Sequence, residues 1–173
     1  TVGIVGLGRI GRAVAERLAG WRVDIIAYDP FIEDAPPNVS LVDLVSLLER
    51  ADIVTLHATP NADNRHLIDA AALARMKPAA LLVNTGRASL VDYGALRQAL
   101  AAHRIGGAAL DVYETEPPAP DDPLFSAGNV LVTPHSAAWT AETLESMGWH
   151  GARNLWSMIS GEGSADIVNP EAR

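Results

Sequence analysis

The segment Val5-Gly6-Leu7-Gly8-Arg9-Ile10-Gly11 spaces three glycines as G-x-G-x-x-G. An apolar run at residues 1–5 precedes the three glycines and has the length of a buried strand, and residues 12–19 continue the segment with a helical pattern. In this order, the first glycine permits a tight turn, the second lets the backbone approach a pyrophosphate, and the third lets helix and strand pack closely. The segment therefore predicts a βαβ unit that binds a dinucleotide, with the helix N-terminus and Arg9 beside the phosphates.

A carboxylate follows the next apolar run at the offset that such a unit needs. Residues 23–28 form the second expected strand, and Asp29 comes directly after it, 18 residues beyond Gly11. An acid at this place accepts hydrogen bonds from the adenosine ribose hydroxyls and repels a 2′-phosphate. Because the segment Tyr28-Asp29-Pro30-Phe31 holds no arginine, the sequence favours NAD over NADP. The alternative is a flavodoxin-like or other glycine turn that matches the pattern by accident.

Length and composition indicate one α/β domain. The 173 residues, 49% of them hydrophobic, suffice for one large core. No run approaches the roughly 18 uninterrupted apolar residues of a membrane span, and the first residues lack the pattern of a signal peptide. The absence of cysteine suits the cytoplasm, and the formal net charge of −8 argues against nucleic acid as a partner.

Strand and helix patterns alternate along the rest of the chain. The expected strands cover residues 53–57, 81–83, 105–110 and 130–132, and the expected helices cover residues 41–49, 69–76, 93–102 and 141–160. Such an alternation predicts a single-domain, doubly wound, mostly parallel sheet of the Rossmann type, with helices on both faces.

Three polar residues fall at the expected carboxyl ends of strands, where ligands of such sheets bind. Arg87 offers a planar fork that holds a substrate carboxylate through two parallel hydrogen bonds. His135 can donate a proton to a carbonyl oxygen as hydride arrives, and Glu116 beside it would favour the imidazolium and fix the ring's tautomer. Together they predict a hydride-transfer site that needs no metal, although each residue alone is as compatible with a surface ion pair or a plain loop.

Four segments closely resemble, in order, motifs of the nucleotide-binding domain of the D-isomer-specific 2-hydroxyacid dehydrogenases. They are residues 6–11, 83–92, 109–117 and 133–137. That family includes phosphoglycerate, glyoxylate/hydroxypyruvate and D-lactate dehydrogenases. The resemblance implies an NAD-dependent oxidoreductase that acts on a CH–OH group and moves a hydride between NAD(H) and C2 of a D-2-hydroxy acid or 2-keto acid.

The resemblance also implies roles for individual residues. Arg87 would bind the substrate carboxylate, His135 would be the acid/base, and Glu116 would be its partner. The implied cofactor contacts are Gly6, Gly8, Arg9, Ile10, Gly11, Asp29, Pro30, His57, Ala58, Thr59, Asn64, Thr85, Gly86, Asp111, His135 and Ala137. Two positions depart from the family pattern, because Ala88 replaces the usual glycine and Pro60 is shifted by one from the usual His-x-Pro spacing.

In that family a smaller substrate domain, made of the residues before the nucleotide domain and of the end of the chain, completes the protein. We therefore expect a Rossmann domain over residues 1–165 and a tail, residues 166–173, that crosses towards a substrate domain outside this chain. Since half of the substrate cleft and its closure would be missing, we expect the 173 residues to turn over little acid by themselves.

The expected last helix has two apolar stripes. One holds Leu144, Met147, Gly151, Leu155 and Ile159, and the other holds Trp149, Ala152 and Trp156. A helix that is apolar on so much of its circumference is usually buried on more than one side. Two explanations stay open, packing beneath the substrate domain and a homodimer contact, which nucleotide domains of the resembled family commonly make.

Two classes of function also stay open. The first is the dehydrogenase, and the second is an NAD-sensing binding module like the transcriptional corepressors of the same superfamily, which retain the three polar residues. Phosphite oxidation uses a similar trio and is a third possible chemistry. Formate dehydrogenases of the superfamily carry glutamine at the position of Glu116, so the glutamate favours a hydroxyacid.

Overall fold

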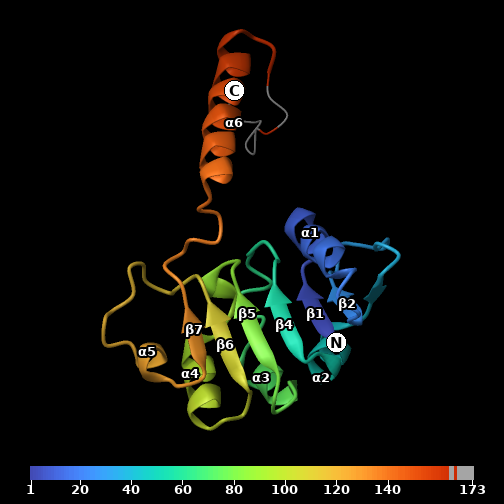
Figure 1. Cartoon of the computed structure of the whole chain (residues 1–173), viewed down its shortest axis with the longest axis vertical. Helices are drawn as coiled ribbons and strands as arrows, with labels where there is room; N and C mark the ends of the chain where they lie inside the picture. The colour runs from blue at the N-terminus through green and yellow to red at the C-terminus, as the bar shows by residue number, and fades with distance from the viewer. Residues whose placement is uncertain (164–165, 167–173) are drawn as a thin grey trace. The chain divides into compact units, whose positions relative to one another are not determined.

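A computed structural model describes residues 1–163 and residue 166 of the chain (Figure 1). The chain divides into two compact units, Thr1–His135 and Ser136–Arg173. The first unit contains a β-sheet with its helices, and the second contains one long helix. Except for Asp166, the expected tail at residues 166–173 lies outside the described residues.

Seven parallel strands form the sheet of the first unit, in the order β3-β2-β1-β4-β5-β6-β7. From β1 the chain continues to β2 and β3 on one side, and then returns to β4 on the other side of β1. The loops after β1 and β4 therefore lie side by side. This is the switch point of the sheet, where ligands of such sheets bind. This topology confirms the predicted doubly wound sheet. The strands are β1 (Val2–Val5), β2 (Ile25–Tyr28), β3 (Val39–Leu41), β4 (Ile53–Leu56), β5 (Leu81–Asn84), β6 (Gly107–Leu110) and β7 (Val130–Val132).

Helices bury both faces of the sheet around β1 and β2. Helices α2 (Leu44–Arg50), α3 (Ala70–Arg75) and α4 (Tyr93–Ala101) contribute to one core cluster, and α1 (Arg9–Leu18) contributes to the other. Successive residues of a strand point to opposite faces, and accordingly Ile26 packs in the first cluster while Ile25 and Ala27 pack in the second. Burial on both faces explains why β2 is an uninterrupted apolar run.

Aspartate side chains cap the N-termini of three of these helices. Asp43, Asp69 and Asp92 each accept a hydrogen bond from a backbone N–H three residues further on. The first of these caps corrects the prediction of a helix from residue 41. Leu41 pairs with Ala27 in the short edge strand β3, so α2 begins only after Asp43.

The second unit consists mainly of α6 (Ala141–Ile159), which Thr140 caps by accepting a hydrogen bond from the Thr143 N–H at 3.1 Å. None of the residues of α6 is buried. The two apolar stripes of this helix were expected to be buried, but none of the described residues buries them. Seven large apolar side chains of this helix are more than half exposed: Leu144, Met147, Trp149, Leu155, Trp156, Met158 and Ile159. Over the described residues, no helix has both the length and the apolar character to cross a membrane.

Candidate cofactor and active site

The turn after β1 has glycines where any side chain would collide. Gly6 has a φ of +92°, and a Cβ there would lie 2.4 Å from the backbone nitrogen of Ala58. A Cβ on Gly11 would lie 2.1 Å from the carbonyl oxygen of Gly6, so this glycine lets α1 pack against the turn. Gly8 differs, because a Cβ there would meet nothing within 4 Å. Its backbone therefore faces open space at the start of α1, where no side chain caps the helix and the first N–H groups can receive an anion.

Asp29 is held against this turn. Its Oδ2 accepts a hydrogen bond from the Leu7 N–H at 2.8 Å, and its Oδ1 accepts one from the Phe31 N–H at 3.0 Å. A carboxylate has about four acceptor positions, so two remain for other donors such as sugar hydroxyls. The negative charge thus stands at the carboxyl end of β2, beside the glycine turn.

A cavity of about 490 Å³ opens between these two features and the loop after β4. Its volume falls within the usual range of small-molecule sites. The predicted residues that line it are Gly6, Gly8, Asp29, Pro30, His57, Ala58, Thr59 and Asn64. Sequence reasoning missed Val5, Tyr28, Phe31, Pro60, Asn61, Asp63 and Leu67, most of which stand within a few residues of the end of β1, β2 or β4. An open glycine backbone, a carboxylate and apolar walls fit the pyrophosphate, ribose and adenine of a dinucleotide.

The loop after β4 is organised by its own polar groups. His57 is linked through Nε2 to the Thr55 hydroxyl at 3.0 Å, and burial lowers the pKa of His57, so its imidazole is neutral at neutral pH. Asn64 donates from Nδ2 to the Thr59 carbonyl at 2.8 Å and accepts the Asn61 N–H at 2.7 Å. Asn64 therefore shapes this wall of the cavity.

Arg87 is presented by a turn that the buried Asn84 controls. At the end of β5, Asn84 accepts the Gly86 N–H at 3.1 Å and donates to the Arg87 carbonyl at 3.0 Å. The Arg87 side chain is exposed, and its Nη1 donates to the Gly86 carbonyl at 2.8 Å. Ala88, the departure from the family pattern, begins a short 3₁₀ turn, Ala88–Leu90, and removes no polar group from this site.

Glu116 and His135 meet at 2.7 Å, between Glu116 Oε2 and His135 Nδ1. The other oxygen, Oε1, accepts the Tyr113 N–H at 3.1 Å. Because a carboxylate only accepts hydrogen bonds, Nδ1 carries the proton, and Nε2 is the nitrogen that can exchange a proton with a substrate. The bond to His135 is the main cause that lowers the pKa of Glu116 below its usual 4.5, and the nearby charge of Arg87 lowers it further.

The depressed pKa of Glu116 sets the pH range of this pair. A carboxyl whose pKa falls on folding contributes stability above its unfolded value and loses that contribution as the pH falls through the folded value. The Glu116 carboxylate is therefore ionised throughout the neutral range, and its contribution to stability is lost in acid, as the pH falls below 4.5.

Two residues that the sequence did not single out connect the ends of β6 and β7. The Thr133 hydroxyl donates to Asp111 Oδ1 at 2.5 Å, and the Tyr113 hydroxyl donates to the Thr133 carbonyl at 2.7 Å. Asp111 is buried and His135 follows Thr133 by two residues, so the contacts align these strand ends. Thr85 and Gly86 lie at the end of the neighbouring strand β5, and Ala137 belongs to the second unit. Across the described part of the chain, no group of three or more metal-ligating side chains is arranged to hold an ion.

A doubly wound sheet with an open Gly8 turn and a carboxylate at the end of β2 is a dinucleotide-binding domain, here with the bonded side chains of Glu116 and His135 at the same edge of the sheet. Residues 1–137 match the family model described as D-isomer specific 2-hydroxyacid dehydrogenase, NAD binding domain. The chain belongs to this family, which confirms the resemblance drawn from its motifs.

Relatives and solved structures are similar over nearly the whole chain. A glyoxylate reductase of Thermofilum pendens is 43% identical over 175 residues, covering 99% of this chain and 52% of that protein. A D-3-phosphoglycerate dehydrogenase of Mycobacterium bovis is 41% identical over 172 residues, covering 98% of this chain and 32% of that protein. The crystal structure of D-lactate dehydrogenase with NAD⁺ from Lactobacillus jensenii has a TM-score of 0.87 and 32% identity, covering 96% of this chain and 54% of that one. The chain thus spans a third to about half of these proteins, and none of them supports the NAD-sensing alternative.

Proposed function

We propose that this chain is the NAD-binding part of a dehydrogenase that transfers a hydride between NAD(H) and C2 of a D-2-hydroxy acid or 2-keto acid. The observation that carries the proposal is the 2.7 Å pair of Glu116 and His135, close to Arg87 and at the same sheet edge as the glycine turn. The family and the names of the relatives support it. We further propose residues 1–165 as the Rossmann domain and residues 166–173 as a tail towards a substrate domain.

NAD(H) would supply the hydride, and this chain would hold the cofactor from the first strand to the last. Gly6, Gly8 and the first turn of α1 would receive the pyrophosphate, and Asp29 the adenosine ribose. The remaining proposed contacts are Arg9, Ile10, Gly11, Pro30, His57, Ala58, Thr59, Asn64, Thr85, Gly86, Asp111, His135 and Ala137, with Asp111 at the nicotinamide carboxamide. The apolar walls of the 490 Å³ cavity support the adenosine assignment.

Three side chains would perform the chemistry on the acid. Arg87 holds the carboxylate by its two parallel N–H groups, which places C2 for transfer. As hydride reaches C2, the carbonyl oxygen gains negative charge and takes a proton from His135 Nε2. Glu116 keeps Nδ1 protonated and stabilises the positive ring, and the same steps run in reverse for oxidation.

The test is NADH oxidation by the full-length protein that contains this chain. We expect turnover with a 2-keto acid from a panel of glyoxylate, hydroxypyruvate, pyruvate and longer homologues. Tight NADH binding without turnover of any member of the panel would overturn the proposed activity.

Asp29 should decide the choice between NADH and NADPH. We expect Asp29→Ser to weaken NADH binding about 10- to 100-fold, because hydrogen bonds to a charged group contribute about 1.5–3 kcal/mol. NADPH binding should strengthen, since the carboxylate no longer repels the 2′-phosphate. Calorimetry with both cofactors measures this, and Asp34→Ser, an exposed aspartate of the same loop, is the matched control. An unchanged preference for NADH in Asp29→Ser would remove Asp29 from the ribose site.

We propose a homodimer in which α6 contacts a second copy of the chain. The seven large apolar side chains exposed on α6 support this, because extended apolar surfaces mark contact sites. We expect Trp156→Lys to shift the full-length protein from dimer to monomer in sedimentation equilibrium. Trp21→Lys, at an equally exposed tryptophan of the first unit, should leave the dimer intact. A wild-type protein that is monomeric at high concentration would assign α6 to the substrate domain instead.

We also propose a cytoplasmic location. The 173 residues contain no cysteine and therefore no disulfide framework, which suits the cytoplasm. Fractionation of cells that express the full-length protein tests this proposal, and recovery of the protein in the secreted fraction would contradict it.

A further inference from the structure

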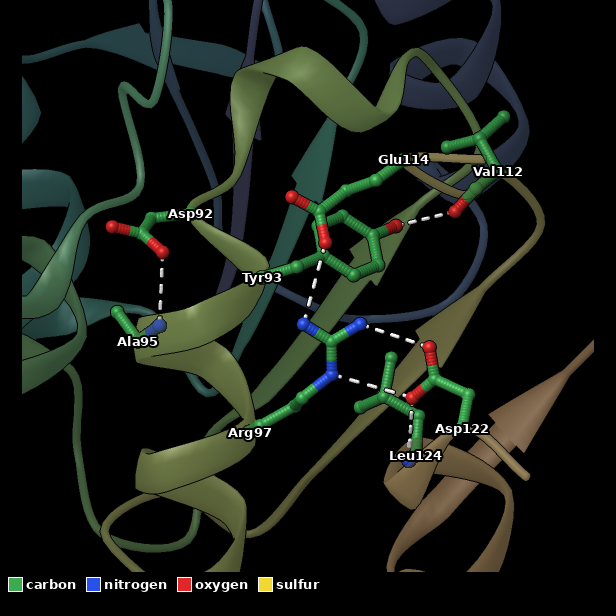
Figure 2. Close-up of polar contacts among 8 residues, drawn as sticks. All are labelled: Asp92, Tyr93, Ala95, Arg97, Val112, Glu114, Asp122 and Leu124. Carbon is green, nitrogen blue, oxygen red and sulfur yellow. Dashed lines mark hydrogen bonds and ion pairs between the residues drawn. The ribbon is translucent and has the colours of Figure 1, made fainter. Parts of the chain in front are cut away.

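One side chain of α4 holds both ends of the loop that carries Glu116. Arg97 Nη1 donates to Glu114 Oε2 at 3.3 Å (Figure 2). Its Nε and Nη2 donate to the two oxygens of Asp122 at 3.2 and 2.8 Å. In the sequence, Glu114 precedes Glu116 and Asp122 follows it. The guanidinium thus spans the loop without touching Glu116 itself.

The hold on Asp122 is partly shielded from water. The Arg97 side chain is 30% exposed and that of Asp122 is 16% exposed. The hydrogen bond from Arg97 is the main cause that lowers the pKa of Asp122, so this pair is charged throughout the neutral range. Asp122 also accepts the Leu124 N–H at 3.0 Å and caps the short helix α5 (Pro123–Ser126), which fixes this end of the loop a second time.

A second residue of α4, Tyr93, fixes the start of the loop. Tyr93 is one turn earlier on α4, is only 1% exposed, and donates its hydroxyl to the Val112 carbonyl (Figure 2). The guanidinium of Arg97 lies 5.9 Å from the centre of the Tyr93 ring. Tyr93 therefore holds Val112 against the core, and Arg97 holds the exposed part of the loop through Glu114 and Asp122.

Glu116 needs such support because it is itself an exposed residue. Its side chain is 39% exposed and that of His135 is 47% exposed, so burial does little to select their conformations. A glutamate side chain loses conformational entropy when it is held in one geometry. A loop that is held at both ends has fewer backbone conformations, so Glu116 loses less conformational freedom when it bonds to His135.

We propose that Arg97 is a positioning residue of the Glu116–His135 pair. Its guanidinium binds Glu114 and Asp122 and thereby fixes the conformation of the loop between them. In this conformation Glu116 reaches His135 Nδ1. The inference rests on the proposed function for its catalytic consequence, while the positioning itself is independent of the substrate.

The first measurement is the tautomer of His135. In ¹⁵N-histidine-labelled protein above neutral pH, the ring nitrogen shifts should place the proton of His135 on Nδ1, with the signal assigned by its loss in His135→Asn. Arg97→Met should move the ring towards the Nε2–H form that predominates in free histidine. Arg97→Lys should do so in part, because it keeps the charge but lacks the fork.

The second measurement is a double-mutant cycle on the full-length protein. We expect Arg97→Met to lower kcat about tenfold, with NADH affinity changed less than twofold, and to have no further effect when Glu116→Gln is already present. Arg75→Met, which breaks the exposed pair of Arg75 and Glu49, is the matched control and should leave both readouts unchanged.

Three outcomes separate the explanations. Equal loss of kcat in the wild-type and Glu116→Gln backgrounds would overturn the proposal, because Arg97 would then act on the fold and not through Glu116. An unchanged His135 tautomer in both Arg97 variants would also overturn it. A tautomer that follows Arg97 in a protein without keto-acid turnover would support the positioning role and overturn the proposed function. If Arg97→Met fails to fold, the same comparisons hold for Arg97→Lys.

Discussion

His135→Asn is expected to lower kcat for keto-acid reduction by about 10²–10⁴-fold, the usual contribution of a positioned general acid. Asparagine can donate a hydrogen bond but cannot transfer a proton to the carbonyl oxygen. It also tolerates the φ of +53° that His135 adopts, so the backbone should be preserved. Steady-state kinetics on the full-length protein measure the loss, and calorimetry should show nearly unchanged NADH binding.

The chain offers a matched control for this substitution. His103 also has a positive φ, of +50°, and lies just after α4, away from the Glu116–His135 pair. His103→Asn should retain full activity. A loss below about tenfold in His135→Asn would show that the proton comes from elsewhere, and an equal loss in His103→Asn would show that the effect is structural.

Arg87→Met is expected to lower kcat/KM for the keto acid about 10²–10³-fold. The substitution removes a charge-assisted, two-point hold on the substrate carboxylate, and removing one partner of such a pair typically costs about 2–5 kcal/mol. Arg87→Lys should recover only part of the loss, because an ammonium group lacks the planar fork. Steady-state kinetics with the best keto acid of the panel measure both variants.

Cofactor binding distinguishes this role of Arg87 from others. NADH affinity should be unchanged in Arg87→Met, and Arg50→Met, at the exposed end of α2, should behave as wild type. A fall in NADH affinity that accounts for the whole loss of kcat/KM would instead make Arg87 a cofactor residue.

The glycine turn after β1 was predictable because its steric requirements are local. Gly6 and Gly11 stand where a Cβ would overlap backbone, so residue type at a fixed spacing reports the backbone path directly. Asp29 follows a strand that pairs with β1, which brings the acid to the turn. The edge strand β3 escaped prediction, because three residues are too few to show an alternating pattern before the Asp43 cap.

The amino-acid sequence was sufficient to predict the β1–turn–α1–β2 unit and the parallel sheet. The steric constraints of the turn act between residues close in sequence, and the alternation of strand and helix patterns indicates a parallel sheet. Tertiary packing supplied the rest. The family resemblance implied that Glu116 is the partner of His135, but their spacing did not, because the two residues are 19 apart. They bond because β6 and β7 are adjacent and their ends are joined through Tyr113 and Thr133. The grip of Arg97 on the loop likewise depends on where α4 packs, and no spacing in the chain reveals a contact that exists only after the strands have taken their order.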